Sequence, residues 1–131
     1  MHVVRHIIAA VTALLLAAAP ALAAGDAAKG QALFNRYCKA CHTVEGTQNR
    51  VGPYLAGVTG RPVATAENYH YTPAMRAFAD THPEWTPDLL AGYLANPRAQ
   101  VPGTRMAYAG TRDQQAAADL AAYLKSLPAA Q

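Results

Sequence analysis

The pattern of apolar and polar positions along the chain predicts helices, and no stretch alternates convincingly enough to be a strand. The first helical pattern follows Asp26, a candidate N-cap residue, and extends through Ala40. Its small, aromatic and cysteine residues recur at helical spacing and share one face, which comprises Ala27, Gly30, Phe34, Tyr37, Cys38 and Cys41. We therefore expect a helix whose C-terminal end carries both cysteines.

Two short helices are predicted in the middle of the chain. Thr72-Pro73 and Thr86-Pro87 each combine a capping hydroxyl with a proline that suits the first helical position. We expect these helices to end near Ala79 and near Asn96, because Pro97 stops the second of them.

The last helix has the most regular pattern. Thr111-Arg112-Asp113-Gln114 fits a capping box at its start, and its apolar stripe ends before Pro128. Proline and glycine punctuate residues 46–73 and 97–110, where we expect long loops. Loops of this length occur in small domains when they are functional or pack on a ligand, so we predict an all-α domain with long loops around a cofactor. The apolar stripe of the last predicted helix consists of Ala117, Leu120, Ala121, Leu124 and Leu127.

Residues 1–23 have the pattern of a secretory signal peptide. A basic start precedes the uncharged run Ile7 to Ala19, and small residues follow Pro20. The run is shorter than the roughly 20 residues that span a bilayer. We expect cleavage after Ala23 and a single domain over residues 24–131, while an uncleaved N-terminal anchor stays open as an alternative.

Composition excludes several classes of protein. The chain has 131 residues, of which 15% are charged, with a formal net charge of +3 and two cysteines. These values do not fit a basic protein that coats nucleic acid, a disulfide-dense mini-protein or an acidic disordered tail. A domain this small is marginal without disulfides or a ligand, so we expect a bound group to complete its core.

Cys38-Lys39-Ala40-Cys41-His42 contains the only two cysteines of the chain and is the attachment signature of haem c. Two thiols near a helix end can each add to a vinyl group of one haem, while His42 offers its imidazole to the iron. A disulfide between the cysteines would close too small a loop to stabilise the fold much. A thioredoxin-like pair needs a preceding strand, and structural zinc needs a fourth ligand. We therefore predict haem.

The opposite side of the iron needs a second ligand, unless it is open to a diatomic gas or peroxide. The candidate side chains in residues 24–131 are Met75, Met106, His70 and His82. Met75 lies beside Phe78 on a predicted helix, which fits core packing. Met106 lies in a turn-rich loop with no helical role, so we predict it as the ligand.

Further motifs follow the cysteines in order. They are Val51-Gly52-Pro53, the segment Leu55 to Arg61, Tyr69-His70-Tyr71-Thr72, Trp85, Tyr93-Leu94 with Asn96-Pro97, the segment Pro102 to Met106, and Asp119-Leu120 with Tyr123-Leu124. This series covers the whole chain after residue 23 and resembles class I cytochrome c, in particular mitochondrial cytochrome c and its small bacterial periplasmic relatives. The resemblance also implies that Gly30 and Phe34 on the first helix cross the last helix at Leu120 and Tyr123.

The resemblance implies a monohaem cytochrome c fold, with helices and long loops wrapped around one covalently bound haem c. Cys38 and Cys41 would form the thioethers, and His42 and Met106 would be the axial ligands. The carbonyl of Pro53 would accept a hydrogen bond from the His42 ring and so orient the imidazole.

The resemblance also implies residues that contact the rest of the haem. Arg61, Tyr71 and Trp85 match family positions around the buried propionates, where a carboxylate removed from water needs a partner. Tyr93 and Thr104 match positions that hydrogen-bond near the methionine sulfur and the propionates, respectively.

The function implied by the resemblance is electron transfer, not catalysis. We expect a monomeric periplasmic carrier of single electrons between respiratory or photosynthetic redox proteins, with no nucleic acid and no stable membrane insertion after cleavage. Its partners would be a cytochrome bc complex, an oxidase, a reductase, a reaction centre or a dehydrogenase. Two alternatives stay open: the electron-accepting subunit of one periplasmic dehydrogenase, and an open-site haem sensor or peroxidase.

The chain departs from many of its relatives in surface charge. After residue 23 its lysines are Lys29, Lys39 and Lys125, and two arginines, Arg98 and Arg105, lie near the predicted methionine ligand. We therefore expect a weak overall field, with attraction of partners through a local patch.

Overall fold

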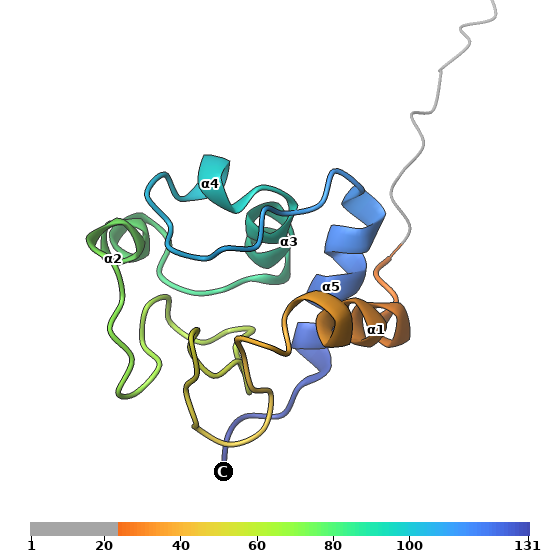
Figure 1. Ribbon diagram of the computed structural model, residues 1–131, viewed down its shortest axis with the longest axis horizontal. Helices are drawn as coiled ribbons and strands as arrows, with labels where there is room; N and C mark the ends of the chain where they lie inside the picture. The colour runs from red at the N-terminus through yellow and green to blue at the C-terminus, as the bar shows by residue number, and fades with distance from the viewer. Residues whose placement is uncertain (1–23) are drawn as a thin grey trace, which may run out of the picture.

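The computed structural model describes residues 24–131, and the predicted signal peptide, residues 1–23, lies outside them. The described chain forms α1 (Ala27–Tyr37), α2 (Pro73–Thr81), α3 (Pro87–Ala95), α4 (Pro97–Gln100) and α5 (Gln114–Ser126). No strand occurs in residues 24–131, which contain only an isolated bridge between Pro62 and Glu84. The fold is all-α, as predicted (Figure 1). None of these helices has both the length and the apolar character needed to cross a membrane.

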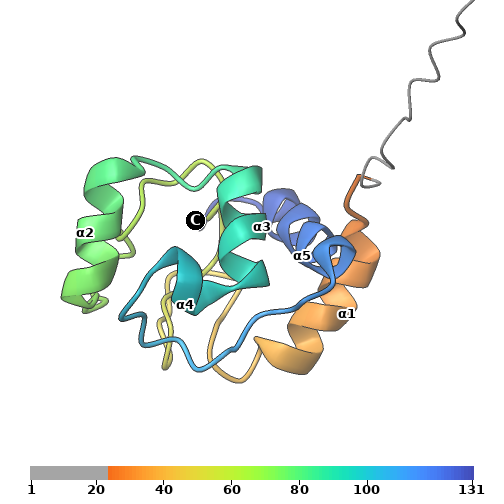
Figure 2. The same ribbon diagram turned by 90° about the horizontal axis from the view of Figure 1, so that it is seen from above.

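Helix α5 packs between α1 and α3 (Figures 1 and 2). Where α1 crosses α5, Gly30 is buried, and a side chain there would overlap the carbonyl oxygen of Asp119 and press on Cβ of Tyr123. The rings of Phe34 and Tyr123 lie 5.5 Å apart, and Leu120 is almost fully buried beside them. The predicted crossing of the first and last helices is confirmed.

A buried carboxylate, to which the sequence analysis assigned no role, also joins these helices. Asp119 on α5 is 5% exposed, and its Oδ1 accepts hydrogen bonds from the backbone N–H of Asp26 at 2.8 Å and from Nε2 of Gln115 at 3.1 Å. Because Asp26 caps α1, this carboxylate fixes the start of α1 against α5.

The predicted caps of α1, α2 and α3 are confirmed. Asp26 accepts from the first-turn amides of α1, and the hydroxyls of Thr72 and Thr86 each accept a backbone N–H at 3.1 Å. Helix α2 ends at Thr81, two residues beyond its predicted end, and α3 ends at Ala95 as expected.

The prediction that the first helix continues through Ala40 is wrong, because α1 ends at Tyr37. Cys38 is the C-cap, and the backbone N–H groups of Cys41 and His42 both donate to its carbonyl oxygen at 3.0 Å. The cysteines and His42 therefore lie on a tight turn after the helix.

Two further details of the helices differ from the prediction. The N-cap of α5 is Asp113, which accepts from two first-turn amides, whereas the Thr111 hydroxyl accepts from the N–H of Asp113 at 3.1 Å. Pro97 ends α3 but also begins the short helix α4, which the Asn96 side chain caps. A proline after a helix can therefore start the next one when its preceding residue is a good cap.

Residues 38–72 contain no helix and form the lower part of the molecule in Figure 1. The main core lies among the helices, and the loops add a smaller core of Tyr54, Ala56 and Ala66. Ala130, near the C-terminus, packs against this smaller core. The helices therefore contribute most of the main core, and small apolar clusters in the loops pack the loops against it.

We expect Gly30→Ala to destabilise the holoprotein by about 1–3 kcal/mol, the usual cost of forcing atoms into a packed core. The new methyl group would overlap the backbone of α5 at Asp119. Urea unfolding of the purified holoprotein measures this change. Gln31→Ala, one residue along on the exposed face, is the control and should stay within about 0.5 kcal/mol of wild type. Equal stability of both variants would contradict a close crossing at Gly30.

Candidate functional site

The turn after α1 presents both cysteines as free, half-buried thiols. Burial, with a further contribution from Cys41, raises the pKa of the Cys38 thiol to about 11. Before any group is bonded to it, Cys38 is therefore a neutral thiol at pH 7, unlike the low-pKa thiolate of a reactive redox pair. Cys38 also packs against the main core, so a group bonded to its sulfur would lie against that core.

His42 is held so that one ring nitrogen is free. Its Nδ1 lies 2.8 Å from the carbonyl oxygen of Pro53, and since a carbonyl only accepts, Nδ1 carries the proton and Nε2 keeps its lone pair. Gly52 packs directly on the ring, where any side chain would overlap it. Burial lowers the pKa of His42, an effect only partly opposed by the bond to Pro53. The imidazole is therefore neutral and oriented, as an iron ligand must be.

Met106 lies in the segment between α4 and α5, half-buried against the main core. The Thr104 hydroxyl is 3.4 Å from the backbone nitrogen of Met106 and 2.8 Å from the hydroxyl of Tyr93 on α3. Met75 on α2 is also half-buried against the same core, so burial does not separate the two methionines. What distinguishes Met106 is its irregular backbone, which is tied to a buried tyrosine.

Arg61 and Trp85 lie together, with the Trp85 backbone N–H donating to the Arg61 carbonyl at 3.0 Å. The Arg61 Nη atoms donate to the carbonyl oxygens of Ala56 and Tyr54, but its buried Nε has no partner within residues 24–131. The Tyr71 hydroxyl accepts from the backbone N–H of Ala66 at 3.0 Å, which leaves its own proton to donate.

These groups test whether the site fits a haem. The buried Nε–H of Arg61 has no acceptor in the described chain, and the structure shows none for the Trp85 indole N–H or the Tyr71 O–H either. A buried, unpaired donor on a guanidinium is costly unless an anionic acceptor reaches it. The propionates of a haem are such acceptors, so the residues present fit this group.

The predicted site residues come from three parts of the chain. His42 and Pro53 are in direct contact, as are Tyr93 and Thr104. Trp85 joins Tyr93 to Arg61, because its ring lies 5.4 Å from that of Tyr93 and its backbone N–H donates to the Arg61 carbonyl oxygen.

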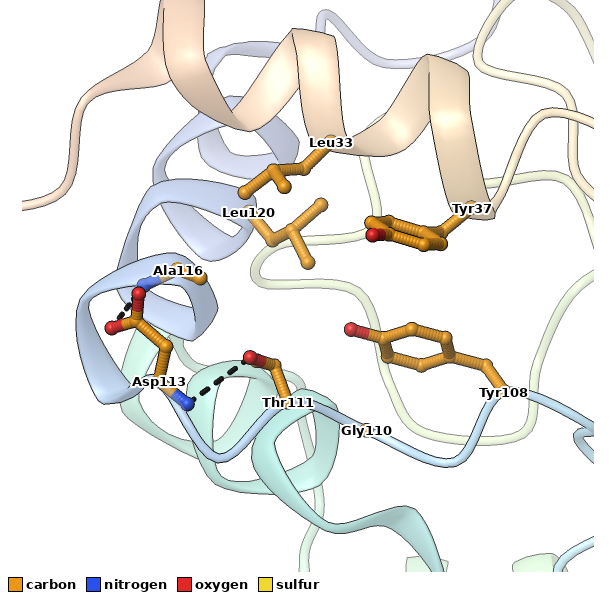
Figure 3. A pocket seen from close by; sticks show the side chains of 8 residues that line it. All are labelled: Leu33, Tyr37, Tyr108, Gly110, Thr111, Asp113, Ala116 and Leu120. Carbon is orange, nitrogen blue, oxygen red and sulfur yellow. Dashed lines mark hydrogen bonds between the residues drawn. The ribbon is translucent and has the colours of Figure 1, made fainter.

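A pocket of about 230 Å³ lies beside the cysteine turn, between the end of α1 and the start of α5 (Figure 3). The hydroxyls of Tyr37 and Tyr108 both point into it, and their rings are 6.1 Å apart. Tyr37 is 48% exposed, whereas Gly30 and Phe34 on the same predicted helix face are buried. Burial, with Cys38 and Tyr37 nearby, raises the pKa of Tyr108.

The other histidine candidates are not placed as ligands. His82 stacks on Phe78 with ring centroids 4.0 Å apart, and its Nδ1 lies 3.0 Å from the Thr81 hydroxyl. His70 is exposed, and its carbonyl oxygen accepts from Arg105. Local packing and surface exposure account for both residues.

A helical domain that presents a Cys-x-x-Cys-His turn, an oriented neutral imidazole and unpaired donors for a buried carboxylate is a c-type haem protein. The cytochrome c family model matches residues 27–128. The chain therefore belongs to the cytochrome c family. Its members are electron carriers with one covalently attached haem c, and this protein accordingly carries one haem c on its only two cysteines.

Similar proteins occur in bacteria and in a fungus. Cytochrome c2 of Blastochloris viridis is 38% identical over 126 residues, which cover 95% of both chains. Cytochrome c of Gibberella zeae is 43% identical over 105 residues, covering 79% of this chain and 96% of the relative. Cytochrome c-type cyt cy of Rhodobacter capsulatus is 45% identical over 109 residues, which cover 83% of this chain but only 53% of that longer relative.

We expect Tyr93→Phe to reduce the loss of stability at alkaline pH. Burial raises the pKa of Tyr93, an effect partly opposed by the bond to Thr104, so above about pH 10 the unfolded chain loses this proton first. The free energy of unfolding therefore falls as pH rises through that range in wild type, and this contribution is absent in the variant. Urea unfolding at a series of pH values measures it.

The matched control for this prediction is Thr104→Val, which removes the same hydrogen bond but keeps the phenol. Both variants should lose about 1 kcal/mol near neutral pH, the net value of one hydrogen bond. Only Tyr93→Phe should then have the shallower alkaline profile. An unchanged profile in Tyr93→Phe would show that this phenol is not held neutral by the fold.

Proposed function

We propose that this protein is a single-electron carrier of the bacterial periplasm in which His42 and Met106 are the axial ligands of the haem iron and Cys38 and Cys41 form its thioethers. The observation that carries this proposal is the His42 ring, whose Nδ1 is 2.8 Å from Pro53 O and whose Nε2 is free for iron. Bound haem supplies the change of one electron at the iron.

The chain's own residues would hold both proposed iron ligands in place while the iron gains or loses an electron. His42 is fixed by Pro53 and Gly52, and the Met106 backbone is tied through Thr104 to Tyr93. Two ligands held in this way rearrange little when the charge of the iron changes. A methionine ligand and a buried site both favour the reduced state, so the proposal places the protein in a high-potential chain.

Arg61, Tyr71 and Trp85 would hold the propionates through donors such as the buried Nε–H of Arg61, which has no acceptor within residues 24–131, and the O–H of Tyr71. Pairing these carboxylates with a guanidinium removes the cost of burying them. The buried rings of Trp85 and Tyr93, packed 5.4 Å apart, would exclude water from this side of the site.

The proposed compartment rests on the N-terminal sequence and on the chemistry of attachment. The run Ile7 to Ala19 has the pattern of an export signal, and the thiols of Cys38 and Cys41 would receive haem after export. The proposed partners are redox proteins: a cytochrome bc complex or a dehydrogenase as donor, and an oxidase, a reductase or a reaction centre as acceptor. We propose a monomer, with residues 24–131 as the mature domain.

The test is absorption spectroscopy of the purified holoprotein. The oxidised wild type should show the weak near-infrared band of methionine bound to ferric iron, and the reduced form should not bind CO. Met106→Ala should lose the band and bind CO readily. Met75→Leu, which alters the other half-buried methionine, is the control and should keep the band.

Two outcomes would contradict the proposal. If the band survives in Met106→Ala and disappears in Met75→Leu, the axial ligand is Met75 and the proposed role of Met106 is wrong. A high-spin wild-type spectrum with ready CO binding would replace the carrier by an open-site sensor or peroxidase.

A further inference from the structure

Tyr54, which was not among the predicted site residues, holds Arg61 in two ways. Its carbonyl oxygen accepts from Nη2 of Arg61 at 2.9 Å, and the guanidinium carbon lies over its ring, 4.6 Å from the ring centre. This distance is within the range of a cation–π interaction. Tyr54 is only 7% exposed, so its ring keeps water away from one face of the guanidinium.

These contacts fix the direction of the remaining donor of Arg61. A guanidinium is planar and carries its N–H groups in a rigid fork. Nη1 donates to the Ala56 carbonyl oxygen at 3.2 Å and Nη2 to that of Tyr54, while the Tyr54 ring lies against one face. Two hydrogen bonds and one stacked ring leave the plane little freedom to turn. The buried Nε–H, which has no acceptor within residues 24–131, therefore points in one defined direction.

The loop in turn holds Tyr54. Its backbone N–H donates to Oδ1 of Asn49 at 3.0 Å, and Nδ2 of Asn49 donates to the Glu67 carbonyl oxygen at 2.7 Å. The preceding residue, Pro53, accepts from the His42 ring. One short segment therefore holds both the proposed iron ligand and the guanidinium.

We propose that Tyr54 is a positioning residue whose ring and carbonyl oxygen hold the Arg61 guanidinium so that its Nε–H meets a haem propionate where water is excluded. The proposal rests on the proposed placement of the propionates at Arg61. Opposite charges attract more strongly where water is excluded, so the covered guanidinium keeps the propionate ionised to lower pH than an exposed one would. Tyr54 acts through Arg61 in this role.

The test is the pH profile of the midpoint potential of the purified holoprotein. An ionised propionate favours ferric iron, so the potential falls as pH rises through the range in which the propionate loses its proton. Tyr54→Leu removes the ring and lets water reach the guanidinium, so this fall should move to higher pH. We expect the proton affinity of the propionate to rise about three- to tenfold, a shift of about 0.5–1 pH unit.

Several titratable side chains lie near the guanidinium or near the rings packed around it. They are Arg61, Glu67, His70, His82 and the phenols of Tyr54, Tyr69 and Tyr71. Tyr54→Leu changes one of these groups only, and a phenol ordinarily ionises near pH 10, far above a carboxyl group. A difference between the two profiles at acidic pH therefore reports on the propionate.

Two variants serve as controls. Tyr54→Phe keeps the ring and the carbonyl oxygen, so it should retain the wild-type profile. Tyr123→Leu removes another buried tyrosine, whose ring packs on Phe34 and not on a cation. It should lower the stability of the protein and leave the profile unchanged. A shift in Tyr54→Phe as large as that in Tyr54→Leu would overturn the role of the ring.

Arg61→Lys distinguishes failure of this proposal from failure of the proposed function. Lysine keeps the charge but lacks the planar fork, so a propionate held here should change its profile in this variant too. A shift in Arg61→Lys without one in Tyr54→Leu would overturn the role of Tyr54 alone. No shift in either variant would show that the propionates are not held at Arg61, and the role of Tyr54 would fall with that placement.

A second measurement does not depend on the folding of Tyr54→Leu. In isotope-labelled, reduced wild type and Tyr54→Phe, hydrogen exchange of the Arg61 Nε–H should be at least about tenfold slower than that of the exposed Arg98, because a hydrogen bond and a covering ring protect it. Equal exchange rates at Arg61 and Arg98 in wild type would overturn the proposal.

Discussion

The close contact of α1 with α5 at Gly30 is the constraint on which the site depends. Because no side chain fits there, the two helix backbones approach each other, and Asp119 fixes the start of α1 at the same place. The end of α1 is thereby fixed as well, and Cys38, its C-cap, starts the turn that presents His42. The position of the proposed iron ligand His42 thus follows from a helix contact about two turns before the end of α1.

The loops are ordered by hydrogen bonds between side chains and backbone in place of strands. Arg61 binds two loop carbonyls, and Asn49 accepts the Tyr54 N–H and donates to the Glu67 carbonyl. Such bonds satisfy the backbone groups that a strand would pair with a neighbour. Within residues 24–131 they leave the buried Nε–H of Arg61 without an acceptor, so the same scaffold that orders the loops leaves a polar group for an anionic ligand.

The features that the sequence predicted correctly, such as the caps of α1, α2 and α3, depend on contacts between residues close together in the chain. Asp26, Thr72 and Thr86 cap helices because a side-chain oxygen needs only the next turn, and this is visible in sequence. The end of α1 was overestimated because Cys38 and Cys41 continue the helical spacing although the backbone turns at Cys38. The motif for haem attachment was visible for the same reason as the caps, since its three functional residues lie within one turn.

Contacts between distant parts of the chain were beyond such rules. Arg105 and Tyr69 are 36 positions apart, and neither residue type signals a partner at that distance. The two proposed iron ligands differ in the same way. His42 follows directly from a helix end and a proposed covalent attachment point. Met106 instead depends on a loop held by the hydrogen bond between Thr104 and Tyr93 and by the two hydrogen bonds that Arg105 donates. Each of those bonds is weak compared with the attachment of His42, so opening of the site should begin on the methionine side.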